Sequence, residues 1–362
     1  MIEGPIQTRF PLNVDSPHAS KPRGLPISAA KATTSDYTPL VKFGDQVRGN
    51  AGVRSSPIAL PDRQHSIAIA GHMIPPQLII GVAFVAVAWP MAWWGPRPFS
   101  DHTFFPLWLG YIFTVDGIVF LRAGSSLLTR GGRAFAALFL ISAPAWWLFE
   151  VANRFLDNWQ YRLPTEYGFW THHLLASISF STVIPAIFET AELYRTTRIG
   201  GKLRHWWMLH PASSGLVWIS VAGAVLFLSS LAFPNALFPA VWLGLFFCID
   251  PINRLLGRPS VAAQVAHGRW DTVLVLFAAG LTCGFFWEMW NYWSMPKWDY
   301  DVPIVDRPKL FEMPLLGYGG YLPFVLELYA VYHFAIGFFG SRWSDFLRFD
   351  QPNETTVAQG NR

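Results

Sequence analysis

Six acidic residues lie inside apolar segments of this 362-residue chain. An ionised carboxylate is costly to place in hydrocarbon, so such groups usually face the inside of a helix bundle, pair with a partner or stay protonated. A protonated glutamic acid in a dry pocket can act as a general acid, and a second carboxylate can be the matching base. The residues are Asp116, Glu150, Glu189, Asp250, Glu288 and Glu327.

The six acids recur in register along the chain. "FEVANRFLDNWQYRLP" at 149–164 aligns with "WEMWNYWSMPKWDYDVP" at 287–303, which gives both segments an E-x-x-N motif followed by W-x-Y-x-x-P. Upstream and downstream the same alignment continues at offsets of 133 to 139 residues. The matched pairs are Asp116 with Asp250, Glu150 with Glu288, Asn153 with Asn291, Pro164 with Pro303, and Glu189 with Glu327. This agreement indicates an internal repeat, with its polar positions on one central seam.

The spacing within E-x-x-N places the glutamate and the asparagine on one face of a helix. An amide there can hold the carboxyl group in one rotamer by hydrogen bonding, so we expect Asn153 and Asn291 to orient Glu150 and Glu288. Buried polar sets of this kind also lock membrane helices together without doing chemistry. Recurrence of all six acids favours a functional cavity over packing alone.

Composition requires a membrane setting for these residues. The chain is 52% apolar, 16% aromatic and 14% charged, whereas soluble domains are about a quarter charged. We therefore predict an all-α polytopic membrane protein, because runs of roughly 20 apolar residues cross the hydrocarbon. The net charge of +4 gives no reason to expect a nucleic-acid partner. Eight transmembrane helices are expected, at 76–95, 104–121, 134–155, 170–192, 213–232, 236–254, 272–293 and 318–340.

The repeat and the spans together predict the organisation of the chain. Each copy comprises three helices, one helix precedes the first copy, and 213–232 links the two. An offset of four helices keeps both copies in the same orientation, so their pseudo-twofold axis should follow the membrane normal. The predicted segments are a disordered cytoplasmic tail at 1–75, a first membrane half at 76–195 containing repeat unit 104–195, a basic loop and linking helix at 196–235, a second repeat unit at 236–340, and a cytoplasmic tail at 341–362.

Basic residues dominate the N-terminal segment and alternate loops, which predicts a multi-pass protein of the cell membrane with both termini in the cytoplasm. Most of the tryptophans are explained by the interfacial belt and by packing. A further interpretation is that Trp287, Trp290 and Tyr321 form the walls of a pocket where π faces stabilise a cation. No haem-type histidine arrangement and no metal-type Cys/His spacing is found, so no cofactor and no metal are expected.

Duplicated three-helix units that carry E-x-x-N, W-x-Y-x-x-P and a last helix with proline before glutamate resemble the integral-membrane lycopene cyclase domains of the heterodimeric or fused kind. The resemblance covers 104–195 and 236–340. That family typically has Pro-x-Glu-Glu on the last helix, where this chain reads "PAIFE" and "PFVLE". The resemblance implies redox-neutral chemistry of the isomerase or lyase class: a carboxylic acid protonates an isoprenoid alkene, aromatic faces hold the carbocation, and a second carboxylate removes a proton. A hydratase would instead let water capture the cation.

The roles expected from this comparison fall into two groups. The predicted catalytic residues are Glu150 and Glu288, with Glu189 and Glu327 as their counterparts. The predicted substrate-binding and supporting residues are Asn153, Asn291, Asp116, Asp250, Trp287, Trp290 and Tyr321. The expected partners are a hydrophobic isoprenoid or lipid ligand and the membrane itself.

Two other classes of protein fit the sequence. One is a non-catalytic membrane subunit that binds a pigment, quinone or lipid and contacts membrane-protein partners. The other is a small proton-coupled transporter, in which paired carboxylates relay protons between two parallel repeats.

Overall fold

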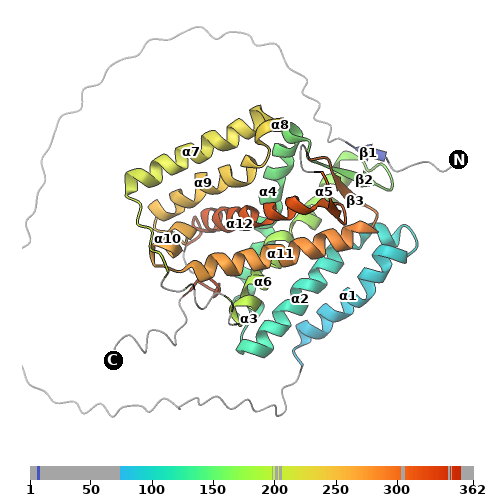
Figure 1. Cartoon of the computed structure of the whole chain (residues 1–362). Coiled ribbons are helices and arrows are strands. Elements are labelled where there is room, and N and C mark those ends of the chain that lie inside the picture. Colours follow the sequence, from blue (N-terminus) through green and yellow to red (C-terminus); the bar gives the residue numbers. More distant parts are fainter. Residues whose placement is uncertain are drawn as a thin grey trace, which may run out of the picture. The chain divides into compact units, whose positions relative to one another are not determined.

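Helices make up most of the described part of the computed structural model (Figure 1), as the apolar composition predicts. The structure describes residues 6–8, 74–197, 199, 203, 206–302, 306–340, 343 and 345–351. Pro303, residues 1–5 and 9–73 of the predicted N-terminal tail, and residues 352–362 of the predicted C-terminal tail lie outside this range, while residues 6–8 form a strand. The helices are α1 (Pro76–Trp94), α2 (Phe104–Ala123), α3 (Leu127–Arg130), α4 (Gly132–Leu156), α5 (Phe169–Phe180), α6 (Val183–Arg195), α7 (Ser213–Ala232), α8 (Pro234–Leu237), α9 (Ala240–Leu255), α10 (Val261–Ala266), α11 (Trp270–Tyr292) and α12 (Tyr321–Ile336).

Within the described residues, six helical segments are long and apolar enough to cross a membrane. They are α1, α2, α4, the run Phe169–Arg195 that contains α5 and α6, α7 and α11. The remaining two predicted spans coincide with α9 and α12, which have 16 residues each. A helix of that length is about 24 Å long, shorter than the roughly 30 Å of hydrocarbon. The structure thus supports a membrane protein, and the total of eight transmembrane helices stays a prediction.

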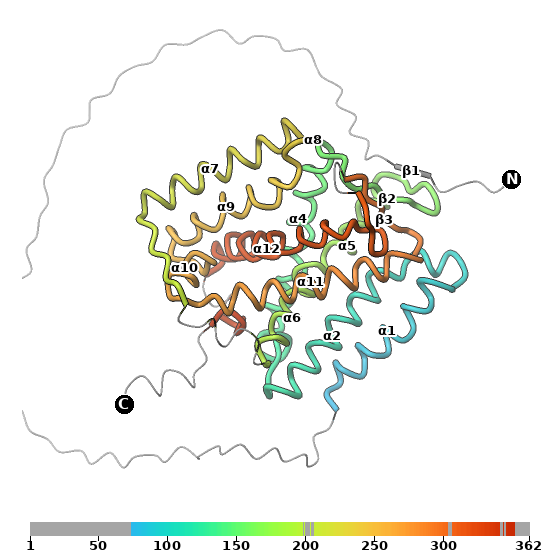
Figure 2. Tube along the Cα trace, viewed as in Figure 1, coloured from blue at the N-terminus to red at the C-terminus, as the bar shows by residue number. Residues whose placement is uncertain are grey.

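The outer helices pack in two matching pairs, α1 against α2 and α7 against α9 (Figure 2). A Cβ atom on Gly110 would meet the carbonyl oxygen of Gly81, and one on Gly223 would meet that of Gly244. Glycine at these positions lets the two backbones approach closely, as small residues do between membrane helices. The helix at 213–232, interpreted from the sequence as a linker, therefore packs on α9 much as α1 packs on α2.

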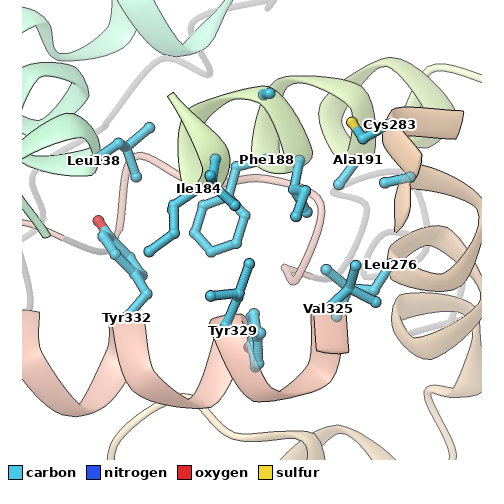
Figure 3. Packing of buried hydrophobic residues seen from close by; sticks show 14 of the residues in the cluster. Leu138, Ile184, Phe188, Ala191, Leu276, Cys283, Val325, Tyr329 and Tyr332 are labelled. Atoms are coloured by element: carbon cyan, nitrogen blue, oxygen red, sulfur yellow. The ribbon is translucent and has the colours of Figure 1, made fainter. Parts of the chain in front are cut away.

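The core surrounds α6, where every residue from Val183 to Glu192 is buried. Burial extends around the whole circumference of this helix and includes the polar residues Glu189, Thr190 and Glu192. Figure 3 shows Ile184 and Phe188 of α6 facing Tyr329 and Tyr332 of α12, with Leu138 of α4 beside them. The central helices α6, α11 and α12 therefore form the frame on which the other elements are placed.

A small antiparallel sheet follows the ends of α4 and α11. Its order is β1 (Ile6–Thr8), β2 (Trp159–Leu163), β3 (Lys297–Tyr300). Strand β2 comes directly after α4 and strand β3 directly after α11, so the two W-x-Y segments of the repeat pair with each other. Two further strands, β4 (Lys309–Leu310) and β5 (Met313–Pro314), form a hairpin before the 3₁₀ turn η3 (Leu315–Gly320). Another 3₁₀ turn, η1 (Phe99–His102), connects α1 to α2.

Candidate functional site

A cavity of about 630 Å³ lies beside the β2–β3 ribbon. Its volume falls within the range of ligand pockets, and its walls are mostly apolar. Both halves of the chain contribute aromatic side chains. The rings that line it are Phe104, Phe105, Trp146, Trp159, Tyr161, Tyr167, Phe180, Phe238, Trp242, Trp287, Trp298, Tyr300, Tyr321 and Phe324.

Glu150 lies behind the cavity wall, near the end of α4, and is 2% exposed. Its Oε1 accepts a hydrogen bond from the hydroxyl of Tyr161 at 2.6 Å. The same oxygen accepts from Nε1 of Trp146 at 2.8 Å and from Nε1 of Trp159 at 3.2 Å. Its Oε2 is buried and has no hydrogen-bond partner among the described residues.

Glu288 has a closely related environment near the end of α11 and is completely buried. Its Oε1 accepts from the hydroxyls of Tyr300 and Tyr321, each at 2.8 Å. Nε1 of Trp298 donates to the Tyr300 hydroxyl at 2.9 Å. As with Glu150, Oε2 has no partner in the described part of the chain.

Tyrosines thus separate the two glutamates from the cavity. Tyr161, Tyr300 and Tyr321 line the cavity, whereas neither Glu150 nor Glu288 is part of its lining. Burial, together with the adjacent glutamate, raises the pKa of the Tyr161 phenol and that of the Tyr300 phenol well above the ordinary value. Both phenols therefore keep their protons at neutral pH, and a ligand in the cavity would meet hydroxyl groups with carboxyl groups behind them.

The two asparagines shape the loops that carry these tyrosines. Oδ1 of Asn153 accepts from the backbone N–H of Asn158 at 2.9 Å, and its Nδ2 donates to the carbonyl of Trp159 at 2.7 Å. Asn291 bonds both the N–H and the carbonyl of Trp298, at 2.8 and 2.6 Å. The predicted amide-to-glutamate contact is replaced by these backbone bonds, because the chain leaving each helix has polar groups that need partners.

The two aspartates hold short helices away from the cavity. Oδ2 of Asp116 accepts from the N–H of Leu128 at 3.0 Å, at the start of α3. Asp250 accepts from Val261 N–H at 2.7 Å and Ala262 N–H at 2.8 Å, at the start of α10. Neither aspartate lines the cavity. They act where helix N-termini present unsatisfied N–H groups, which favours a packing role.

The second predicted pair of glutamates lies in the core. Glu189 and Glu327 are both fully buried, and neither lines the cavity. Glu189 interacts electrostatically with Asp116. Both carboxyl oxygens of Glu327 have no hydrogen-bond partner within the described residues. The structure therefore brings Glu150 and Glu288 to the cavity wall and leaves Glu189 and Glu327 away from it.

Two of the three predicted aromatic residues contribute to the cavity. Trp287 and Tyr321 line it with ring centroids 6.1 Å apart and nearly parallel planes. Trp290 lies outside it and packs edge-on against Trp108 at 5.0 Å. Sequence reasoning did not select Tyr161 and Tyr300 as site residues, although the recurrence of W-x-Y in both halves was a signal for them.

The cavity lining also includes Asp101, His102, His172 and Lys297, although most of its wall is apolar. Among the residues that the structure describes, no three His, Cys, Asp or Glu side chains are grouped as a metal site requires. Comparisons with models of known families, with curated proteins and with solved structures give no match. The functional argument therefore rests on the chemistry of this site.

Proposed function

We propose that this protein binds an isoprenoid or carotenoid-type alkene in the aromatic cavity and cyclises or hydrates it by acid–base catalysis. The observation that carries the proposal is that two buried glutamates, Glu150 and Glu288, each bond cavity-lining phenols. A mostly hydrocarbon ligand suits the apolar walls, and phenol–carboxyl pairs supply the few polar groups that such a pocket needs to orient it.

The chemistry balances without an oxidant. A phenol O–H bond breaks as its proton forms a new C–H bond with the alkene π electrons, and the carboxylic acid behind the phenol replaces the proton. The resulting carbocation closes a ring onto a second double bond, or is captured by water. A second phenol then accepts a proton from the cation while its own proton moves to the other carboxylate. The aromatic faces of Trp287 and Trp242, which line the cavity, would stabilise the cation by about 0.5–2 kcal/mol each.

We propose further that the chain is duplicated and crosses the cell membrane eight times, with both termini in the cytoplasm. Matching interactions in the two halves support the duplication. Ser126 before α3 and Ser260 before α10 each accept a hydrogen bond from the backbone N–H three residues later. Another backbone N–H at the start of each short helix donates to an aspartate, Asp116 for α3 and Asp250 for α10. The helix pairs α1–α2 and α7–α9 extend the match, so the repeat unit contains four helices rather than three.

A specific observation also favours a second function, a non-catalytic binding protein for a pigment, quinone or lipid. Because tyrosines separate both glutamates from the cavity, the phenols could serve only as hydrogen-bond donors to a bound ligand. Such a protein would bind an apolar molecule in the same place and leave it unchanged.

Purified protein in detergent can be tested with squalene, an acyclic polyene, in D₂O. Quenching of tryptophan fluorescence measures binding, and mass spectrometry measures deuterium uptake and ring or alcohol formation. Catalysis predicts uptake that is lost in Glu288→Gln while binding persists. Glu327→Gln makes the same change in a fully buried residue away from the cavity and is the matched control, expected to retain uptake. Binding without any uptake in the unaltered protein would favour the non-catalytic function.

A further inference from the structure

The two glutamate sites differ in one pair of residues. Trp146 precedes Glu150 by four positions, whereas the equivalent position before Glu288 is Gly284. The space beside Gly284 is filled by the ring of Tyr321, because a Cβ atom at Gly284 would meet three atoms of that ring. The counterpart of Tyr321 in the first half is Val183, two residues before the matched proline. The Trp146 indole beside Glu150 is thus replaced, beside Glu288, by the phenol of Tyr321, which comes from another helix.

This exchange changes what each glutamate can do with a proton. Glu150 is bonded by two indole N–H groups and one phenol, and Glu288 by two phenols together with the Trp298 indole. An indole N–H donates a hydrogen bond and does not give up its proton, whereas a phenol can act as an acid or a base. Each glutamate therefore has three donors, and only Glu288 has a second phenol among them.

We infer that the two halves have separate roles in one reaction. Glu288 with Tyr321 delivers a proton to the ligand, and Glu150 with Tyr161 later removes a proton from the cation that forms. This inference rests on the proposed function. The Tyr321 O–H bond breaks as the ligand C–H bond forms, and the Glu288 carboxylic acid restores the phenol. Later, Tyr161 accepts the departing proton and passes its own to the Glu150 carboxylate. Exchange with water returns both glutamates to their starting states.

Tyr321 is better placed than Tyr300 to deliver the proton. The Tyr300 oxygen already accepts the Trp298 indole N–H at 2.9 Å, while in the described part of the chain no indole donates to the Tyr321 hydroxyl, which donates to Glu288 at 2.8 Å. The Tyr321 ring is also stacked with Trp287 in the cavity wall. A cation formed beside Tyr321 would therefore lie near an aromatic face that stabilises it.

The test compares Tyr321→Phe with Tyr332→Phe, using squalene in D₂O as the probe. Each change removes one buried phenol hydroxyl from α12 and keeps the aromatic ring, but Tyr332 does not line the cavity and donates to the carbonyl of Trp343 instead of a glutamate. Tyr321→Phe should lower deuterium uptake by about 100-fold, the scale of general acid catalysis, with squalene binding unchanged within twofold. Tyr332→Phe should retain uptake within a few fold. Equal losses in the two variants, or unchanged uptake in Tyr321→Phe, would overturn the division of roles.

A second variant guards against simple loss of folding. The double change Gly284→Trp with Tyr321→Val transfers the residues of the first half to the second. We expect it to retain its helical circular dichroism and its squalene binding but to lose uptake to the level of Tyr321→Phe. Full uptake in the double variant would contradict the assigned role of Tyr321. Absence of uptake in the unaltered protein would instead refute the proposed function itself.

Discussion

Gln160 and Asp299 are paired in the β2–β3 ladder, between two tryptophan–tyrosine pairs. On one side Trp159 is opposite Tyr300, and on the other Tyr161 is opposite Trp298. Because each W-x-Y segment aligns with the other in sequence, these three pairs are arranged symmetrically about Gln160 and Asp299. The ribbon therefore brings the phenols that serve Glu150 and Glu288 to one cavity, although the two glutamates are on different helices.

The asparagine that precedes each strand should be important for this placement. Asn153→Ala and Asn291→Ala each remove hydrogen bonds from backbone groups of the loop. We expect each to lower the free energy of unfolding by about 2–4 kcal/mol, since unsatisfied buried groups cost about 1–3 kcal/mol apiece. The loss of stability can be measured by unfolding each variant in increasing concentrations of SDS. Gln160→Ala, in the same ribbon and with no side-chain hydrogen bond found in the described residues, is the control and should change little.

The glycines between the outer helices provide a second test. Gly110→Ala and Gly244→Ala place a methyl group against the backbone or Cβ of the facing helix. Overpacking should lower the free energy of unfolding by about 1–3 kcal/mol, despite the higher helix propensity of alanine. Gly132 is also helical but has open space beside it, so Gly132→Ala should be neutral or slightly stabilising. Stability retained in both tested variants would contradict close packing of α1–α2 and α7–α9.

Much of the helical framework could be predicted, because hydrocarbon thickness sets a length that apolar runs must match. The predicted spans at 76–95 and 213–232 lie within one residue of α1 and α7 at each end. The start of α12 was predicted less closely, because η3 occupies the first residues of the predicted span at 318–340. The repeat also predicted functional roles for Glu150 and Glu288, and both lie directly behind tyrosines that line the cavity.

The contacts of the site could not be predicted with the same success, for physical reasons. Spacing shows that Glu150 and Asn153 share a helix face, but it does not show that the backbone after the helix competes for the amide. Likewise, Tyr321 reaches Glu288 from another helix across the gap left by Gly284, a tertiary contact that no local pattern records. Glu189 and Glu327 recur in register as Glu150 and Glu288 do, so recurrence alone could not separate the cavity wall from the core.

Glu192 connects α6 to the segment 345–351, within the predicted C-terminal tail. Its Oε1 accepts from the N–H groups of Arg348 and Phe349, and its Oε2 pairs with Arg130 at 2.8 Å. Glu192→Ala leaves the Arg130 charge without this buried partner and should lower the free energy of unfolding by about 3–5 kcal/mol. Limited proteolysis should then cleave the C-terminal segment faster. Glu166→Ala, at an exposed position, is the control, and equal protease sensitivity in the two variants would contradict this role.

The two capping aspartates should differ in their contribution to stability. Asp250 bonds two N–H groups of α10, whereas Asp116 bonds one at α3 and also lies near Glu189, whose carboxyl group it opposes. We expect Asp250→Ala to lower the free energy of unfolding by about 2–4 kcal/mol, since each hydrogen bond to a charged group contributes about 1.5–3 kcal/mol. We expect Asp116→Ala to lower it by only about 1 kcal/mol, because removing this aspartate also relieves its repulsion with Glu189. SDS unfolding of both variants gives the comparison, and hydrogen exchange of the α10 amides reports the local effect. A larger loss in Asp116→Ala would show that the Asp116 contact with Glu189 is stabilising, for instance through a shared proton, and would place that pair among the groups that hold the core together.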